Sequence, residues 1–160
     1  MHDIRYKPIG TIRSPFKDIQ GMPIQPAGAE GVAGRVEIEP AYIEGLKDLE
    51  GFSHIILIYH FHLSKGYALE VKPFMDDRVH GVFSTRAPRR PNSIGLSVVR
   101  LISVRGHNLE VQDVDIVDGT PVLDIKPYVP EFDVRSVDRI GWLSQRVNRV
   151  HDMTADERVR

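Results

Sequence analysis

Runs of alternating apolar and polar residues recur along this chain, and they predict a protein built mainly from β-strands. Turn signals such as Lys65-Gly66 and Asp118-Gly119 separate the runs. The expected strands are Tyr6 to Ser14, Gly34 to Glu39, a long central strand from Phe52 to Leu63, and then Ala68 to Pro73, Gly81 to Thr85, Leu96 to Val104, Leu109 to Val114 and Val122 to Val129. Many short, closely spaced strands are typical of an antiparallel sheet rolled into a barrel or folded into a sandwich.

The pattern predicts one short helix and a C-terminal tail besides the strands. Pro40 precedes a helical stretch from Ala41 to Leu49, and Gly51 stands just beyond its end. After Pro130 the polarity rises, so residues 139 to 160 are expected to form a helical or frayed tail. A chain of 160 residues that is 41% hydrophobic forms one core. We therefore expect one compact β domain over residues 1–135, with residues 136–160 as a tail of the same unit.

Composition narrows the classes of function. The chain has no cysteine, which excludes disulfides, thiolate metal sites and a thiol nucleophile. Its polar N-terminus does not resemble a signal peptide, and its longest apolar-leaning run is too short to cross a bilayer. The sequence thus predicts a soluble cytoplasmic protein without a membrane partner.

A net charge of −1 hides a strong asymmetry along the chain. Residues 78 to 109 hold six arginines and no lysine, aspartate or glutamate. Residues 110 to 138 hold eight acids against only Lys126 and Arg135. This arrangement favours a positive site on one face with a negative site beside it.

The arginines concentrate in the loop Thr85-Arg-Ala-Pro-Arg-Arg-Pro-Asn-Ser-Ile-Gly95. Its two prolines fix φ and remove backbone donors, so we expect a stiff loop that holds Arg86, Arg89 and Arg90 in fixed relation. Guanidinium groups bind phosphate or carboxylate in a planar, two-pronged manner. The alternative is that these arginines merely solvate a turn, but no acidic neighbour in the sequence is available to pair with them. The loop is therefore a candidate anion site.

The segment from Asp115 to Pro121, followed by Asp124, is a second candidate. Asp118-Gly119 is a strong hairpin signal, so the carboxylates can simply cap a turn. Acids at a strand end beside a glycine turn also suit ribose hydroxyls, an ammonium or a cationic substrate centre. The crowding of Asp115, Asp118 and Asp124 favours a ligand role.

Other chemistry has little support in the sequence. His60 and His62 lie on one face of the expected strand, but a metal needs at least one further ligand and no carboxylate has suitable spacing, so no metal is expected. The chain has no G-x-G-x-x-G, no P-loop and no G-x-S-x-G elbow. The common nucleotide folds and serine hydrolases are thus not indicated.

Several motifs in a fixed order resemble the TrmO/TsaA-like family, which contains the tRNA (adenine-37-N6)-methyltransferase. The resemblance covers roughly Ile9 to Pro130. The motifs are Gly10-Thr-Ile-Arg-Ser-Pro15, Gly45-Leu46, Gly51-Phe-Ser-His54, Gly81-Val-Phe-Ser-Thr-Arg86, Arg90-Pro-Asn-Ser-Ile-Gly95 and Asp118-Gly-Thr-Pro-Val-Leu-Asp-Ile-Lys-Pro-Tyr128.

The resemblance implies an antiparallel β-barrel that binds S-adenosylmethionine (SAM) without a Rossmann fold. It also implies a homodimer with the cofactor near the subunit interface, and methylation of N6 of threonylcarbamoyl-adenosine 37 in the tRNA anticodon loop. By motif, the cofactor residues are Pro26, Ala27, Gly28, His62, Leu63, Ser64, Arg86, Leu96, Asp115, Ile116, Val117, Asp118, Gly119, Thr120 and Pro121. The residues expected to bind the RNA substrate are Arg89, Arg90, Asn92, Lys126 and Tyr128.

Two features depart from the family pattern. Ser93 stands where the family usually has proline, and longer bacterial relatives carry a C-terminal domain that is not matched by this chain. Two other functions therefore stay open: a SAM-dependent methyltransferase with a different acceptor, and a non-catalytic module that binds RNA or anionic ligands. Methyl transfer from a sulfonium is an in-line displacement and needs no covalent intermediate. The catalytic residues stay unassigned, because either a carboxylate or water can remove the N6 proton.

Overall fold

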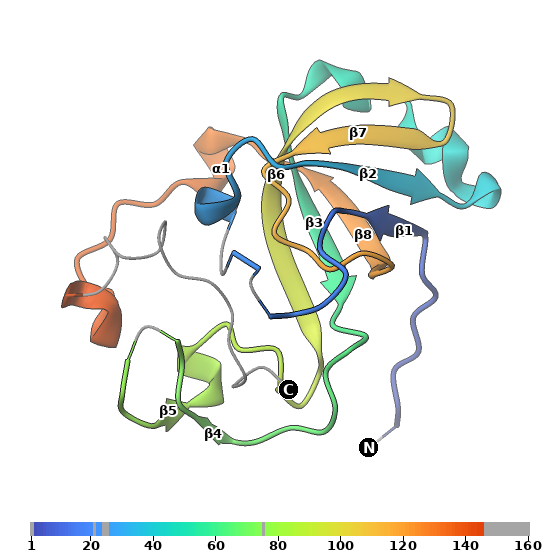
Figure 1. The fold of residues 1–160 in the computed structure, drawn as a ribbon. Helices are drawn as coiled ribbons and strands as arrows, with labels where there is room; N and C mark the ends of the chain where they lie inside the picture. Colours follow the sequence, from blue (N-terminus) through green and yellow to red (C-terminus); the bar gives the residue numbers. More distant parts are fainter. Residues whose placement is uncertain (1, 21, 24–25, 75, 146–160) are drawn as a thin grey trace.

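Six antiparallel strands close into a barrel in the computed structural model, which describes residues 2–20, 22–23, 26–74 and 76–145 (Figure 1). The strand order around the barrel is β1-β2-β7-β6-β3-β8. The bounds are β1 Gly10–Arg13, β2 Ala33–Ile38, β3 His54–His60, β6 Ile94–Arg105, β7 Asn108–Gln112 and β8 Pro121–Pro127. The predicted fold class, mainly β with an antiparallel barrel, is confirmed.

Strict alternation of side chains fills the barrel interior. In β3, Ile55, Leu57 and Tyr59 are buried, while the residues between them are half-buried. In β6 every second residue from Gly95 to Leu101 is buried. This period of two is what a strand with one face in the core requires. The interior therefore consists of one apolar row per strand, and it becomes polar only at the end of the barrel marked by Tyr59 and Ser97.

The barrel closes between β1 and β8 through a short ladder and an adjoining segment. Only Gly10 and Thr11 pair with β8 in register. Beyond them, Ile12 N–H donates to Thr120 O over 2.9 Å, and Gly119 N–H donates to Ile12 O over 2.8 Å. The acidic segment from Asp115 to Pro121 therefore completes the seam, because it satisfies backbone groups of β1 that β8 does not reach.

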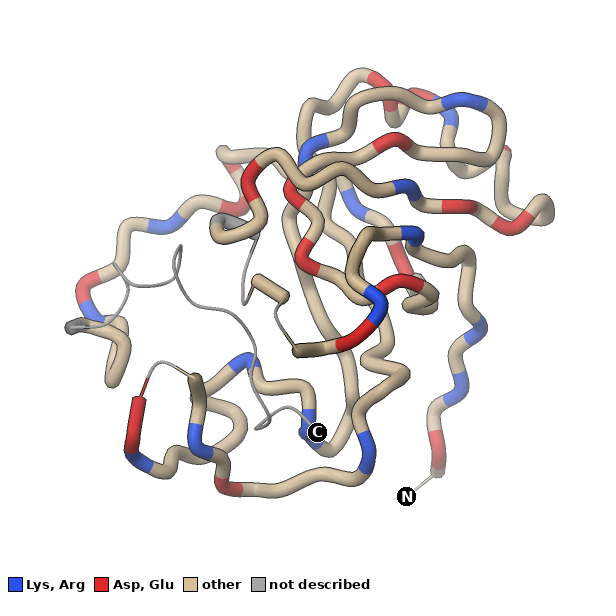
Figure 2. The backbone as a smooth tube through the Cα atoms, viewed as in Figure 1, with Lys and Arg blue, Asp and Glu red and all other residues tan. Residues whose placement is uncertain are grey.

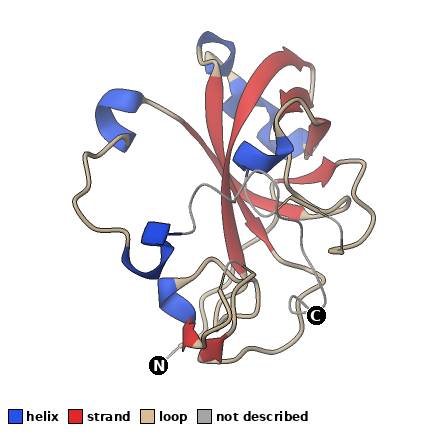
Figure 3. Cartoon of the chain, turned by 60° about the vertical axis from the view of Figure 1, so that its left-hand side comes forward, coloured by secondary structure: helices blue, strands red, loops and turns tan. Residues whose placement is uncertain are grey.

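A smaller lobe lies beside one end of the barrel (Figures 1 and 3). It contains the two-stranded sheet of β4 (Glu70–Val71) and β5 (His80–Gly81), followed by the 3₁₀ helix η4 (Val82–Ser84). The chain after the barrel forms α1 (Pro130–Asp133) and then η5 (Gly141–Gln145), whose Trp142 contacts the lobe.

The helical region differs in type from the prediction. Instead of one helix from Ala41 to Leu49, the chain forms two 3₁₀ helices, η2 (Pro40–Leu46) and η3 (Leu49–Gly51). Asp48 separates them with φ of 69°, a left-handed conformation that an α-helix does not accommodate. A further 3₁₀ helix, η1 (Pro26–Ala29), lies in the loop before β2.

Some strands are shorter than their patterns predict. β1 begins at Gly10 rather than at Tyr6, and Tyr6 is exposed. The expected strand from Gly81 to Thr85 becomes β5 followed by η4. Tyr6 and Phe83, the aromatic residues of these two patterns, are exposed rather than part of a ladder. No helix among the described residues is long and apolar enough to span a membrane.

We predict that Gly95→Ala destabilises the barrel by about 1–3 kcal/mol. A Cβ atom at residue 95 would lie 2.7 Å from Phe61 Cζ and 2.7 Å from Tyr59 Cζ. These two rings contact each other edge to face at 5.5 Å, so neither has space to move aside. Urea denaturation followed by circular dichroism measures the change.

Gly45→Ala is the matched control, because a Cβ atom there meets nothing within 4 Å. We expect its urea midpoint to equal or slightly exceed that of the wild type. Equal midpoints for both variants would show that the Tyr59–Phe61 pair yields freely and that the prediction is wrong.

Candidate functional site

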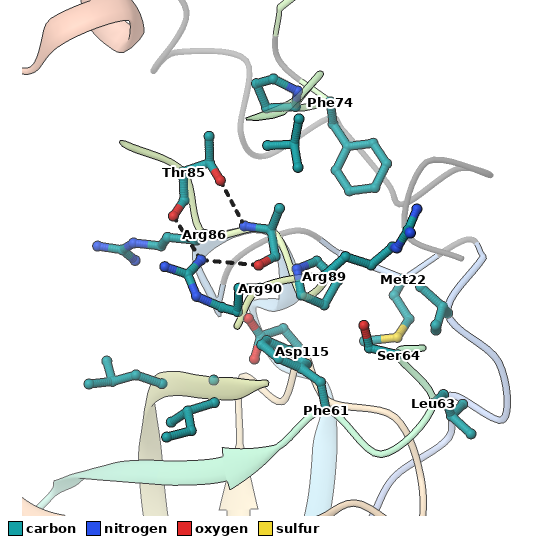
Figure 4. Close-up of a pocket in the computed structure, with 18 of the residues that line it drawn as sticks. Met22, Phe61, Leu63, Ser64, Phe74, Thr85, Arg86, Arg89, Arg90 and Asp115 are labelled. Atoms are coloured by element: carbon teal, nitrogen blue, oxygen red, sulfur yellow. Dashed lines mark hydrogen bonds between the residues drawn. The ribbon is translucent and has the colours of Figure 1, made fainter. Parts of the chain in front are cut away.

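A cavity of about 1260 Å³ lies between the barrel end and the lobe (Figure 4). The barrel contributes the ends of β3 and β6 and the segment after β7, while the lobe contributes β4 and η4. Further walls come from the loop before β2, from the arginine loop and from η5. Its apolar side chains include Ile19, Met22, Phe61, Phe74, Leu96 and Leu143. This volume exceeds the usual range for a drug-sized ligand, so the cavity has room for more than one ligand.

The arginine loop is rigid, and one of its own arginines helps to make it so. Arg90 Nη1 donates hydrogen bonds to Thr85 O at 3.0 Å and to Ala87 O at 3.1 Å (Figure 4). Arg89 Nε donates to Lys65 O over 3.3 Å, which ties the loop to the segment after β3. Arg90 therefore stabilises the conformation of the loop. Arg86 is the most exposed of the three arginines in the loop.

Basic residues follow the segments around the cavity. Figure 2 shows Lys and Arg along the lobe and the loops that join it to the barrel. Arg86, Arg89 and Arg90 line the cavity together with Lys72 of the chain after β4. Glu70 and Asp115 are the acids that line it among the described residues. The cavity therefore favours an anionic group near the arginine loop.

The two aspartates of the acidic segment lie in different places. Asp118 accepts hydrogen bonds from Ser14 N–H at 3.0 Å and from Lys17 Nζ at 2.9 Å, beside a shallow depression outside the main cavity. The hydrogen bond from Lys17 holds the pKa of Asp118 below its usual value. Asp118 thus fastens the turn to the chain after β1, while Asp115 lines the cavity.

Asp115 is buried, with 8% of its surface exposed. Ser97 Oγ donates a hydrogen bond to Asp115 Oδ1 over 2.7 Å, and Ser97 Oγ lies 2.8 Å from Tyr59 Oη. Burial raises the pKa of Asp115 to about 7, although the hydrogen bond from Ser97 and the charge of Arg86 act in the opposite direction. A carboxyl group that changes its charge near neutral pH therefore stands in the cavity wall.

The chain just after β3 adds polar groups to the cavity. His62, Leu63 and Ser64 all line it. Ser64 Oγ is buried and has no hydrogen-bond partner among the described residues, which is costly unless a ligand or water supplies one. Partial burial, followed by the neighbouring His60, lowers the pKa of His62, so its imidazole is uncharged at neutral pH.

The wall opposite the barrel is completed by Trp142 of η5. Its indole stacks on His80 with ring centres 4.7 Å apart, and its Nε1–H donates to Ser84 O over 2.9 Å. His80 in turn contacts Asp76 at 2.8 Å. The C-terminal segment is therefore part of the site rather than a detached tail, as far as residue 145.

The structure brings most of the predicted site residues together. Those that line the cavity are His62, Leu63, Ser64, Arg86, Leu96, Asp115, Ile116, Val117 and Thr120 of the expected cofactor set, with Arg89 and Arg90 of the expected substrate set. Gly119 lies next to the cavity, since a Cβ atom there would be 3.8 Å from His62 Nε2. Pro26, Ala27 and Gly28 lie in η1, which packs beside β6. The side chains of Pro26 and Ala27 are outside the described part of the structure.

The remaining predicted residues lie elsewhere. Asp118 faces the depression near Lys17, Pro121 begins β8, and Asn92 is exposed on the arginine loop. Lys126 pairs with Asp124, and Tyr128 N–H bonds to His54 O. His54 is five residues before Tyr59 on β3, which at about 3.3 Å per residue is more than 10 Å from the cavity. Lys126 and Tyr128 therefore mark the other end of the barrel.

Sequence patterns missed a large part of the wall. Met22, Phe61, Phe74 and Trp142 belong to segments that only the tertiary fold places together. Of these four residues, only Trp142 could have been noticed in the sequence, because it is the single tryptophan of the chain and lies in a polar stretch. No group of three or more potential metal ligands occurs among the described residues.

We predict that Asp115→Asn changes the pH dependence of stability. A carboxyl pKa raised from 3.8 to about 7 by folding means that the folded state holds a proton that the unfolded state has lost. The resulting stabilisation is complete below pH 4 and is lost as the pH rises through 7. Relative to the variant, the wild type should lose on the order of 4 kcal/mol of unfolding free energy between pH 4 and pH 8.

Urea denaturation of both proteins at several pH values measures this difference. Glu70→Gln is the control, because it removes a carboxylate that is exposed in the same cavity. The unfolding free energy of Glu70→Gln should depend on pH in the same way as that of the wild type. If the Asp115→Asn curve also runs parallel to that of the wild type, Asp115 is an ordinary carboxylate.

Comparisons with known proteins identify the family of the chain. Residues 11–134 match the family described as the tRNA-methyltransferase O N-terminal domain. A probable S-adenosyl-L-methionine-binding protein of Pyrococcus abyssi is 57% identical over 155 residues, which cover 97% of this chain and 84% of that protein. The tRNA (adenine(37)-N6)-methyltransferase of Escherichia coli is 37% identical over 81% of this chain and 60% of the enzyme.

A solved structure gives the same result for the fold. The crystal structure of TrmO from Pseudomonas aeruginosa superimposes with a TM-score of 0.74 and 40% identity, over 88% of this chain and 63% of that one. The chain thus spans about three fifths of the length of these two bacterial relatives. The family match covers well over half of the chain and includes the barrel and the cavity loops, so the chain belongs to the family of tRNA-methyltransferase O N-terminal domains.

Proposed function

We propose that this protein is a SAM-dependent methyltransferase that methylates N6 of threonylcarbamoyl-adenosine 37 in tRNA. One observation carries the proposal: a rigid arginine loop and a buried acidic residue line the same cavity, which is large enough for two ligands. The family and the name of the Escherichia coli relative support the reaction, and the names of several relatives support the cofactor.

The residues that line the cavity fit SAM. Arg86 is suited to the carboxylate of its methionine part. The unpaired hydroxyl of Ser64 and the neutral imidazole of His62 are suited to its hydroxyl or amino groups, and Leu96 and Ile116 offer apolar surface to its adenine. When bound, SAM supplies an activated methyl group to a nucleophile. The protein's part is to hold both reactants in line and to exclude water.

The rest of the cavity suits a nucleotide of an RNA loop. Arg89, which is tied to Lys65 O through Nε, lines the wall beside Arg86, and the carboxylate of a threonylcarbamoyl group or a phosphate can bind there. Phe61, Phe74 and Phe83 offer faces on which a base can stack, as is usual in RNA loops. Asn92 lies exposed on the same loop, where it can contact the RNA backbone.

Lys126 and Tyr128 fit the proposed function only if the RNA contacts a surface wider than the cavity. They lie at the other end of the barrel from the cavity, so they belong to the substrate site only if the tRNA extends along β8 or if a second subunit brings them near another cavity. The resemblance implies a homodimer. Leu96 and Ile102 on the outer side of β6 are 54% and 50% exposed, which offers apolar surface for such an interface.

A second function is a SAM-dependent methyltransferase of another acceptor. Two findings from the comparisons favour it. The bacterial relatives extend well beyond the region that this chain matches. The Pyrococcus abyssi relative is described only as binding the cofactor. In that case SAM binds and tRNA stays unmodified. A non-catalytic RNA-binding module, in contrast, binds tRNA in a salt-dependent manner without a need for SAM.

We predict that SAM binds in the cavity and that its methyl group reaches tRNA. Trp142 is the only tryptophan in the chain and lines the cavity, so its fluorescence should change on titration with SAM. Incubation with labelled SAM and tRNA that carries threonylcarbamoyl adenosine should yield the N6-methylated nucleoside, detected by mass spectrometry. Calorimetric binding without methylation would leave the second function.

We predict that Arg86→Ala abolishes methyl transfer while the barrel stays folded. The variant loses a guanidinium group from the cavity, and a hydrogen bond to a charged group contributes about 1.5–3 kcal/mol, so SAM affinity should fall at least about tenfold. Calorimetry measures the affinity and circular dichroism checks the fold.

Arg105→Ala is the matched control, because Arg105 ends β6 eleven residues beyond Ile94, which lines the cavity. It should bind SAM and methylate tRNA as the wild type does. Wild-type activity in Arg86→Ala would remove Arg86 from the site.

A further inference from the structure

Asp115 occupies the place where the apolar barrel interior meets the cavity. Its carboxyl group lies between the barrel end and the arginine loop (Figure 4). The other acid that lines the cavity among the described residues, Glu70, is exposed on β4. A carboxylate at an interior boundary loses much of its hydration, and this makes it a stronger proton acceptor than an exposed one.

Three separate segments fix the position of this carboxyl group. Asp115 follows β7, Ser97 is on β6 and Tyr59 is on β3, and their side chains form one chain of hydrogen bonds. Ser97 and Tyr59 are 1% and 5% exposed. The Tyr59 ring is held against Phe61, so the whole chain of hydrogen bonds has little freedom to move.

The charges around Asp115 are few. Arg86, on the arginine loop, is the cation that acts on it, and it favours the ionised carboxylate. Tyr59 is neutral, because burial raises the pKa of its phenol. Ser97 donates its hydroxyl hydrogen to Oδ1. With a pKa of about 7, Asp115 is largely ionised at pH 8 and ready to take up a proton.

We propose that Asp115 accepts the proton that the acceptor nitrogen loses during methyl transfer, and that Ser97 and Tyr59 are positioning residues for it. This inference rests on the proposed function. The lone pair of N6 in threonylcarbamoyl adenosine is delocalised into the ring and the carbamoyl carbonyl, so the nitrogen is a poor nucleophile while it keeps its hydrogen.

The step balances as follows. The N6–H proton moves to the Asp115 carboxylate, and the electron pair left on nitrogen forms the new N–CH₃ bond. The S–CH₃ bond breaks with its electron pair retained by sulfur, which becomes a neutral thioether. Asp115 ends the step as a neutral acid and returns its proton to solvent before the next turnover.

The test compares Asp115→Asn with Glu44→Gln, which removes an exposed carboxylate on η2, outside the cavity lining. Single-turnover rates with labelled SAM and tRNA that carries threonylcarbamoyl adenosine should fall about 10²- to 10⁴-fold at pH 8 in Asp115→Asn. They should be unchanged in Glu44→Gln. The affinity for SAM, measured by calorimetry, should stay within about threefold of the wild type, since the inferred role concerns the acceptor.

A second measurement does not depend on tRNA. Calorimetry of SAM binding at pH 7 in buffers of different ionisation enthalpy counts the protons exchanged. The wild type should release a fraction of a proton, because a cationic ligand favours the ionised carboxylate. Asp115→Asn should release none. If SAM binds with this signature but tRNA stays unmodified, the acceptor named in the proposed function is wrong, whereas SAM binding without this signature overturns the role of Asp115.

Ser97→Ala tests the positioning role. The hydrogen bond from Ser97 lowers the pKa of Asp115, so its removal should move the midpoint of the pH–rate profile upward from about 7. A merely structural serine would leave that midpoint in place. Three results would overturn the inference: a near-wild-type rate in Asp115→Asn, a rate loss matched by an equal loss of SAM affinity, or no difference in proton release.

Discussion

Closure of the barrel between β1 and β8 is the constraint on which the site depends. Two residue pairs make the ladder at this seam, and the segment from Asp115 to Pro121 supplies the remaining backbone partners. Because that segment must follow β1 closely, its side chains are fixed in direction. Asp115 turns toward the cavity, and Asp118 turns outward to Ser14 and Lys17. The closure of the barrel thus places Asp115 in the cavity wall and gives Asp118 a structural role.

Strand alternation is a local property, so the sequence predicted a mainly antiparallel β protein, and the family resemblance chose the barrel over a sandwich. The sequence predicted the arginine loop for the same reason: prolines and arginines act within eleven residues. It did not divide the roles of the arginines, since only the folded loop shows that Arg90 bonds to Thr85 O and Ala87 O. Cavity residues from other segments, such as Phe74 and Trp142, could not be predicted from the sequence, because no local pattern indicates which loops line the same cavity.

The acidic segment shows the limit of reasoning from crowded charges. Asp115, Asp118 and Asp124 are near one another in sequence, yet they face the cavity, the chain after β1 and Lys126, respectively. Asp115 and Asp118 lie in the irregular segment between β7 and β8, whose backbone bonds to β1, and Asp124 lies on β8. The resemblance to a family pointed to this segment as part of the cofactor site, and four of its residues line the cavity. The structure then shows that one of these three carboxyl groups lines the cavity.

The lobe that walls the cavity is held far more lightly than the barrel. β4 and β5 share two residue pairs, and the link to η5 consists of the Trp142 stack on His80 and one hydrogen bond to Ser84 O. By contrast, β3 and β6 pair over seven residues. Local opening of the lobe is therefore expected to cost less free energy than global unfolding. Such an opening would admit a nucleotide while the barrel and its buried carboxyl group stay in place.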